Sequence, residues 1–297
     1  QRCSMKKMFA AVAAVVLTAA VAVSMAACGG GATVKIVEID LSSEQYGVAI
    51  QKGNTELKEK IDEILERLTG DGIEVGGETV TFDSLYQAEM DALAANEQIS
   101  IGEVKTSSSN RSEELVVATN AEFAPFEYQV GTSFGGIDMQ VAKIIAESMN
   151  KTLVIKHMAF ESVLQDVQSG DSDIAMAGLT INAERAQQVD FSEPYYDTTQ
   201  RIAVAADNTA FDECETEEDV VNVLKSLTGV KAGAAKTQTG YYYLVGEESF
   251  EFEGYPNIST SAYPSVAAAV QDLANGAVSI VCADAVPLQA AVNAVNR

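Results

Sequence analysis

One arginine in this sequence is placed where it could bind a carboxylate. Arg185 ends the stretch AGLTINAER (177–185), which begins where a predicted strand (173–177) ends. Its planar guanidinium offers a fixed pair of donors that matches a carboxylate, which a lysine cannot do. In the same stretch, Gly178 lets the backbone approach a ligand and Thr180 offers a hydroxyl and an amide. Taken singly, an arginine more often forms a surface ion pair and a threonine such as Thr180 more often caps a helix.

Two polar residues farther along the chain could complete such a site. Thr239 stands at the start of a predicted helix (240–245), where free backbone amides favour an anion such as a carboxylate. Asp284 directly follows a predicted strand (278–283) and is a candidate partner for a ligand ammonium. An aspartate in this place is also often only the cap of the next helix.

Strands and helices that alternate along the chain must position these residues. The first run predicts strands at 115–119, 152–158 and 173–177, with helices at 139–149 and 162–168. The second run predicts strands at 201–206, 230–235 and 278–283, with helices at 240–245, 265–273 and 286–295. Such alternation indicates two lobes, each a mostly parallel sheet flanked by helices. Ligands of open α/β sheets bind beyond the carboxyl ends of the strands, which is where the polar residues above lie.

The segment before these runs contains a well-defined amphipathic helix. In YGVAIQKGNTELKEKIDEILERL (46–68), Leu57, Ile61, Ile64, Leu65 and Leu68 form one apolar stripe with a period of 3.6 residues. A small hairpin (73–82) and a second helix follow. The region 97–114 reads as a linker, because KTSSSNRSEE (105–114) is polar, small and aperiodic.

The first residues have the pattern of an export signal. Lys6 and Lys7 precede an apolar run (9–23), and small residues lead to Cys28. We predict upstream residues and a lipoprotein signal peptide over 1–27, with Cys28 as the lipidated residue. An uncleaved membrane helix is the alternative, but the run is short for a span.

A formal net charge of −24 argues against nucleic acid or an anionic membrane surface as the main partner.

The sequence gives little indication of a metal site or of a disulfide. The sequence has one histidine, and the acidic run FDECETEEDV (211–220) lacks the spaced ligands and turn glycine of a calcium loop. We expect no metal site and no cofactor. Cys214 and Cys282 could pair in an exported compartment, although a buried free thiol is the simpler reading of Cys282.

Several stretches together resemble a known family. ATNAEFAPFEY (118–128), AGLTINAER, AAKTQTGYYYL (234–244), CAD (282–284), DFSEPYY (190–196) and GGIDMQVA (135–142) are similar to the extracellular solute-binding proteins of polar amino-acid ABC transporters. The resemblance implies the two-lobed type 2 periplasmic-binding-protein fold, with a two-segment hinge.

The resemblance also implies the residues that contact a ligand. They are Asn120, Phe123, Phe160, Gly178, Thr180, Arg185, Thr239 and Asp284. Phe123 and Phe160 match aromatics that stack on the ligand side chain, and Phe126 is expected to be core. Some relatives have Asp at the position of Asn120, facing a cationic side chain, so Asn here allows a polar neutral ligand. The family often has Gly-Thr-Thr-Gly in the turn that is 237–240 in this chain, which reads Thr-Gln-Thr-Gly.

The function implied is that of a monomeric, lipid-anchored receptor on the outer face of the bacterial cell membrane. It would close on a free polar L-amino acid, without covalent chemistry, and deliver it to the permease subunits of an ABC importer. Two alternatives stay open: an exported dehydratase-like enzyme on the same fold, and a ligand-sensing module. Neither the amino acid nor the permease follows from the sequence.

The order of the parts suggests a circular permutation. The stretch 46–72 resembles the closing segment of the family, which normally follows the second lobe, yet here it comes first. We therefore predict 28–51 as the first part of the second lobe, 52–200 as the first lobe and 201–297 as the rest of the second. On this prediction, 33–39 and 46–51 are strands of the second lobe, and the helix at 55–68 packs on the first. A remnant of an upstream copy fused to a truncated one is the alternative.

Overall fold

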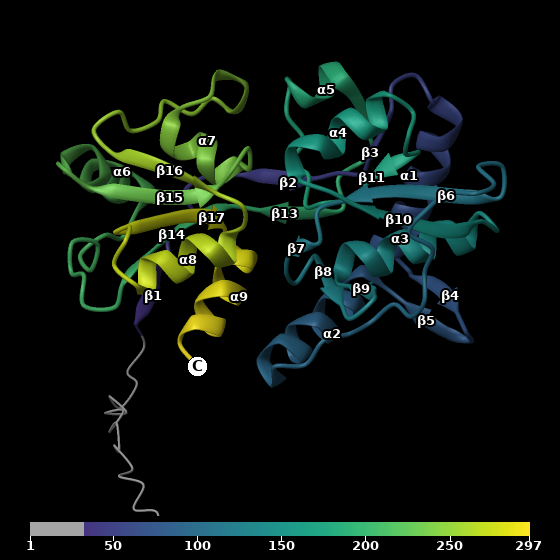
Figure 1. Cartoon of the computed structure of the whole chain (residues 1–297), viewed down its shortest axis with the longest axis horizontal. Helices are drawn as coiled ribbons and strands as arrows, with labels where there is room; N and C mark the ends of the chain where they lie inside the picture. The colour runs from purple at the N-terminus through teal and green to yellow at the C-terminus, as the bar shows by residue number, and fades with distance from the viewer. Residues whose placement is uncertain (1–32) are drawn as a thin grey trace, which may run out of the picture. The chain divides into compact units, whose positions relative to one another are not determined.

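The computed structural model describes residues 33–297, in which strands and helices alternate around two five-stranded sheets (Figure 1). The first sheet has the order β10 (Thr152–His157), β6 (Glu114–Thr119), β11 (Ile174–Ala175), β3 (Ala49–Gln51) and β12 (Val189–Phe191). The second has the order β1 (Val34–Val37), β14 (Gln200–Ala205), β17 (Ile280–Asp284), β15 (Lys231–Ala235) and β16 (Ser259–Tyr263). The parts built on them are called the first and second lobes.

Some predictions lie outside the described residues. The signal peptide (1–27) and the lipidation site Cys28 are among them. No helix in the described region is long and apolar enough to cross a membrane.

Helices cover both faces of the first sheet. They are α1 (Thr55–Thr69), α2 (Phe82–Ala95), α3 (Ile137–Ser148) and α4 (Phe160–Gln168). The predicted stripe of α1 is buried at Ile61, Ile64, Leu65 and Leu68, and the helix packs against α2 and α3. Its first turn is capped by Asn54, whose Oδ1 accepts from the Leu57 amide at 3.3 Å. The predicted placement of this helix on the first lobe is therefore what the structure shows.

The second sheet is covered in the same way. Its helices are α6 (Glu217–Ser226), α7 (Thr239–Val245), α8 (Val266–Ala274) and α9 (Ala285–Val295). One apolar core includes Val270, Leu288 and Val281, and a separate one includes Leu224, Leu244 and Ile280. Because Ile280 and Val281 point to opposite faces of β17, the two cores lie on opposite sides of this sheet.

Smaller elements connect the lobes and carry the loops. They are β2 (Glu44–Tyr46), β4 (Ile73–Val75), β5 (Glu78–Val80), β7 (Glu122–Phe123), β8 (Glu127–Val130), β9 (Ser133–Gly135), α5 (Arg185–Gln188), β13 (Tyr196–Thr198) and a 3₁₀ turn, η1 (Glu248–Phe250). β2 and β13 pair antiparallel and link the two lobes (Figure 1).

The prediction that 46–51 belongs to the second lobe is wrong. β3 lies in the first sheet, between β11 and β12, where Ile50 faces both Ile174 and Asp190. Ala49 and Ile50 are both fully buried, as expected for a strand covered on two faces. The chain therefore changes lobe through β2, before residue 49, and only β1 of the predicted pair lies in the second sheet.

Both sheets are mostly parallel, as predicted, because four of the five strands in each run in the same direction. β10, β6 and β11 run parallel, but β3 is antiparallel to both β11 and β12. β16, β15 and β17 run parallel, but β14 is antiparallel to β17 and to β1. The antiparallel strands β3 and β14 directly follow β2 and β13, the segments that cross between the lobes. A chain that arrives from the other lobe enters the sheet from the opposite end, so its strand runs against its neighbours.

The predicted linker is organised around one carboxylate. Glu114 is 1% exposed and accepts from the amides of Ser109 and Asn110, both at 3.0 Å. It also accepts from Lys105 Nζ at 2.8 Å and Ser108 Oγ at 2.7 Å. These bonds, that of Lys105 first, hold the pKa of Glu114 well below its usual range. Residues 105–114 thus form a turn tied to the start of β6, not the flexible linker that the sequence predicted.

Candidate functional site

Most of the predicted ligand residues meet in one small cavity between the lobes. From the first lobe come Phe123, Phe160, Gly178 and Arg185, and from the second come Thr239 and Asp284. Ala177 and Gln238 complete the lining. The cavity has a volume of about 10 Å³, which is enough for about one water molecule. The two lobes are therefore in near contact here, and an amino acid can enter only if they separate.

Arg185 lies in this cavity at the start of α5 and is 6% exposed. Its Nη1 donates to the Thr180 carbonyl at 2.9 Å, and its Nη2 reaches the Thr237 carbonyl of the second lobe at 3.5 Å. The guanidinium carbon lies 5.6 Å from the ring centre of Phe160 and 5.5 Å from that of Phe250. Burial lowers the pKa of Arg185, but an arginine stays charged. No acidic side chain in the described region forms an ion pair with it.

Asp284 lines the same cavity from the second lobe, at the end of β17. It is 3% exposed, and its Oδ1 accepts from the hydroxyl of Tyr46 at 2.7 Å. Burial, followed by the negative charge of Glu44, raises the pKa of Asp284 to about 7, against the opposing hydrogen bonds of Tyr46 and Gln200. This carboxyl therefore changes its charge near neutral pH.

The hydroxyls of Thr180 and Thr239 join the lobes directly. Their oxygens are 3.1 Å apart, and Thr180 Oγ1 donates to Glu44 Oε2 at 3.0 Å. Glu44 also accepts from Ser42 Oγ at 2.6 Å. Since Thr180 gives its proton to Glu44, Thr239 donates to Thr180 and the chain of hydrogen bonds has one direction.

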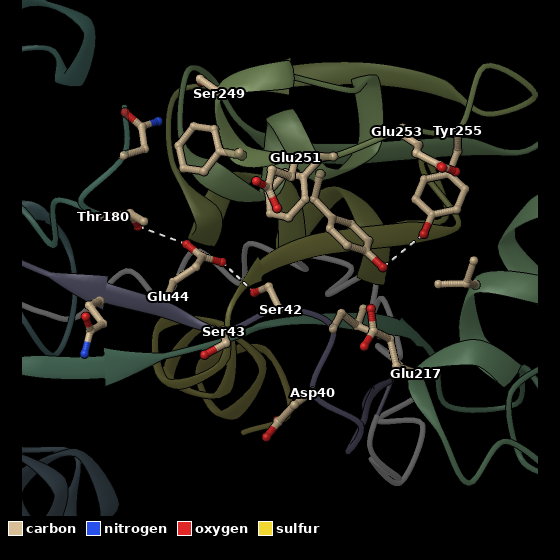
Figure 2. Close-up of a pocket in the computed structure, with 18 of the residues that line it drawn as sticks. Asp40, Ser42, Ser43, Glu44, Thr180, Glu217, Ser249, Glu251, Glu253 and Tyr255 are labelled. Atoms are coloured by element: carbon tan, nitrogen blue, oxygen red, sulfur yellow. Dashed lines mark hydrogen bonds between the residues drawn. The ribbon is translucent and has the colours of Figure 1, made fainter. Parts of the chain in front are cut away.

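A larger cavity of about 950 Å³ is lined by Thr180 and Glu44 (Figure 2). Figure 2 shows Glu44 between Ser42 and Thr180, and the second-lobe residues Glu217 and Tyr255 also line this cavity. Glu44 and Thr180 line the large cavity, and Thr180 is hydrogen-bonded to Thr239, which lines the small one. Both cavities lie where the lobes meet, so separation of the lobes would open them together.

Asn120 is not brought into the small cavity. It is 5% exposed, and its Nδ2 donates to the Met158 carbonyl at 2.9 Å. Thr180 likewise lines the larger cavity rather than the smaller one. Phe126, expected to be core, is fully buried against Tyr46, with ring centres 5.2 Å apart.

Four neighbours of the site were not found from the sequence. Glu44 was assigned only to the second lobe as a whole, Tyr46 was read as the first residue of a second-lobe strand, and Phe250 carried no signal. Gln238 was noticed only as a departure from the family turn. This departure could have indicated that Gln238 contacts the ligand, because glutamine is a longer polar residue than the threonine that the family often has in this turn.

The cysteines and the acidic residues form no further site. Cys214 and Cys282 are both free thiols, and Cys282 is fully buried. Over residues 33–297, no group of three or more His, Cys, Asp or Glu side chains could hold a metal ion.

Comparisons with known proteins agree with this architecture. A family model described as "Bacterial extracellular solute-binding proteins, family 3" matches residues 115–294. The probable histidine-binding protein of Neisseria gonorrhoeae is 30% identical over 169 residues, which are 57% of this chain and 58% of that protein. The cyclohexadienyl dehydratase of Pseudomonas aeruginosa is 37% identical over 82 residues, 27% of this chain and 31% of that enzyme.

Among solved structures, an ancestral arginine-binding protein bound to arginine is 29% identical with a TM-score of 0.52. The match covers 61% of this chain and 74% of that chain. The chain spans less than two-thirds of the length of either curated relative named above.

Proposed function

Because this chain belongs to the bacterial extracellular solute-binding proteins of family 3, we propose that it is the substrate-binding receptor of an ABC importer. Its two lobes close on a free polar L-amino acid and deliver it to the permease subunits. The histidine-binding relative and the arginine-bound ancestral protein support an amino acid as the ligand. The receptor carries out no covalent chemistry.

One observation carries this proposal: Arg185 and Asp284 lie in the same cavity but do not pair with each other. Removing a charged group from water costs several kcal/mol, and an opposite charge nearby is needed to offset this cost. An amino acid supplies a carboxylate for Arg185 and an ammonium for Asp284, so one ligand compensates both charges. Thr239 adds a free backbone amide at the start of α7, and Gly178 allows close approach.

The two aromatic residues of the cavity are assigned to the ligand side chain. Phe123 is 4% exposed and Phe160 stands at the start of α4, so both present apolar ring surface to the cavity. Phe160 also packs on the guanidinium of Arg185, which orients the donors that receive the carboxylate.

The chain order and the anchor are part of the proposal. A circular permutation is supported by β1, which joins the second sheet, and by α1, which packs in the first lobe. With a lipid on Cys28, the second lobe would be tethered to the outer face of the cell membrane. The receptor would act there as a monomer.

A thermal-shift screen with all common amino acids and cystine tests the proposed function. A ligand present at 100 times its dissociation constant should stabilise the protein by about 2.7 kcal/mol. The exposed arginine of α1 provides a control, since Arg67→Ala should respond to ligand like the wild type while Arg185→Ala should not. A protein that no amino acid stabilises is not this receptor.

An exported dehydratase-like enzyme on the same fold is the second candidate. It is favoured by the match to the cyclohexadienyl dehydratase and by Asp284, whose pKa of about 7 would suit a general acid or base. Incubation with a prephenate-like acid separates the two candidates. Release of product that requires Asp284 would establish the enzyme, and binding of amino acids without turnover would establish the receptor.

A further inference from the structure

Gln238 sits in the turn between β15 and α7, at the start of the helix that carries Thr239. Its backbone is fixed by local bonds: the amide donates to the Ala235 carbonyl at 3.2 Å, and the carbonyl accepts from the Tyr241 amide at 3.0 Å. The preceding residue, Thr237, has a φ of 60°. The side chain of Gln238 does not cap the helix. The turn is therefore held by the backbone, and its formation does not require a glutamine side chain.

That side chain is nevertheless buried in the small cavity between the lobes. Gln238 is 7% exposed, and its Oε1 has no hydrogen-bond partner among residues 33–297. A buried amide oxygen without a partner is unfavourable, because it has lost its bonds to water. Gln238 shares the cavity with Arg185 and Asp284, so it lies within the volume where the lobes meet.

The other polar groups of the cavity are already assigned. Arg185 faces the carboxylate of the ligand, and Asp284 faces its ammonium. The hydroxyl of Thr239 donates to Thr180. Gln238 Oε1 is thus the side-chain acceptor of this cavity that has no partner among residues 33–297, and Gln238 lines the cavity together with Phe123 and Phe160.

We propose that Gln238 selects the ligand side chain, with Oε1 accepting a hydrogen bond from an N–H donor of that side chain. This inference rests on the proposed amino-acid receptor and names its ligand class: amino acids with amide, guanidinium or similar N–H donors. An acidic side chain would place a second acceptor against Oε1, near the charges of Asp284 and Glu44. An apolar side chain would leave Oε1 unsatisfied.

Calorimetry with four ligands tests this selection. Glutamine and arginine carry the donor; methionine has a similar length to glutamine but no donor, and glutamate is acidic. The wild type should bind glutamine or arginine about 5- to 150-fold more tightly than methionine, the range expected when a buried acceptor is left unpaired. Gln238→Met should remove most of this ratio. Gln271→Met, at an exposed glutamine of α8 in the same lobe, should leave it unchanged.

A second variant covers the case in which Gln238→Met does not fold. Gln238→Glu keeps an acceptor and adds a negative charge, so it should increase the preference for arginine over glutamine. An unchanged ranking in this variant, or a wild type that prefers glutamate or methionine, overturns the role of Gln238. If the wild type binds all four ligands with similar affinity, the selection fails while the receptor function stands. If it binds no amino acid at all, the proposed function itself is wrong.

Discussion

The unusual protonation of Asp284 allows a quantitative prediction for Asp284→Asn. The pKa of an unfolded aspartate is about 3.9, whereas burial and Glu44 raise that of Asp284 to about 7. Between these values the folded protein keeps a proton that the unfolded chain has released, so the stability contributed by this group falls as the pH rises. The full difference corresponds to about 4 kcal/mol, of which roughly 2–3 kcal/mol falls between pH 5 and pH 8.

Asparagine has nearly the same shape and keeps an oxygen that can accept from Tyr46, but it cannot ionise. Without ligand, Asp284→Asn should therefore stabilise the protein by roughly 2–3 kcal/mol more at pH 8 than at pH 5. Urea unfolding of both proteins at the two pH values measures this difference. Asp190→Asn is the control, because its carboxylate is held ionised at both pH values by the Gly53 amide.

The same substitution should weaken amino-acid binding at pH 8, where the wild-type carboxylate is ionised and faces the ammonium. The opposite signs of the two effects, on stability and on affinity, distinguish a ligand-binding carboxylate from a structural one. A stability change that is equal at pH 5 and pH 8 would show that Asp284 does not titrate near neutrality, and the electrostatic reasoning would be wrong.

Three further substitutions test the site. Arg185→Ala should weaken binding of every amino acid by about 2–5 kcal/mol, because the α-carboxylate is common to all, and calorimetry on the folded variant that finds wild-type affinity would contradict the assignment. Asn120→Asp should lower stability by about 1–3 kcal/mol in urea unfolding, since a carboxylate cannot donate to the Met158 carbonyl, and an unchanged midpoint would refute this. Phe250→Ala should weaken binding by about 0.5–2 kcal/mol without changing the ranking of ligands, because its ring packs on Arg185; a changed ranking in calorimetry would mean that Phe250 contacts the ligand side chain.

The sequence by itself determined the helices and strands that depend on residues close together along the chain. The stripe of α1 follows from contacts three and four residues apart, and its predicted bounds of 55–68 differ from the structure by one residue. β6, β10 and β15 are short apolar runs between turns, and they were found for the same local reason. The resemblance to a family also predicts six ligand residues that line one cavity in the structure, and their role in binding stays a prediction: Phe123, Phe160, Gly178, Arg185, Thr239 and Asp284.

Only the tertiary structure decided how distant segments pair. The apolar run at 46–51 is compatible with either sheet, and the partners available to Ile50 in the first sheet determine its place. Tyr46 and Asp284 are 238 residues apart, so no local pattern in the sequence could show that the Tyr46 hydroxyl donates a hydrogen bond to Asp284. The pKa of Asp284 depends on burial and on the charge of Glu44, which come from the assembly of both lobes with the crossing segment. Gln238 Oε1 likewise has no partner among residues 33–297 only because folding removes water from this acceptor without placing a donor of that region beside it.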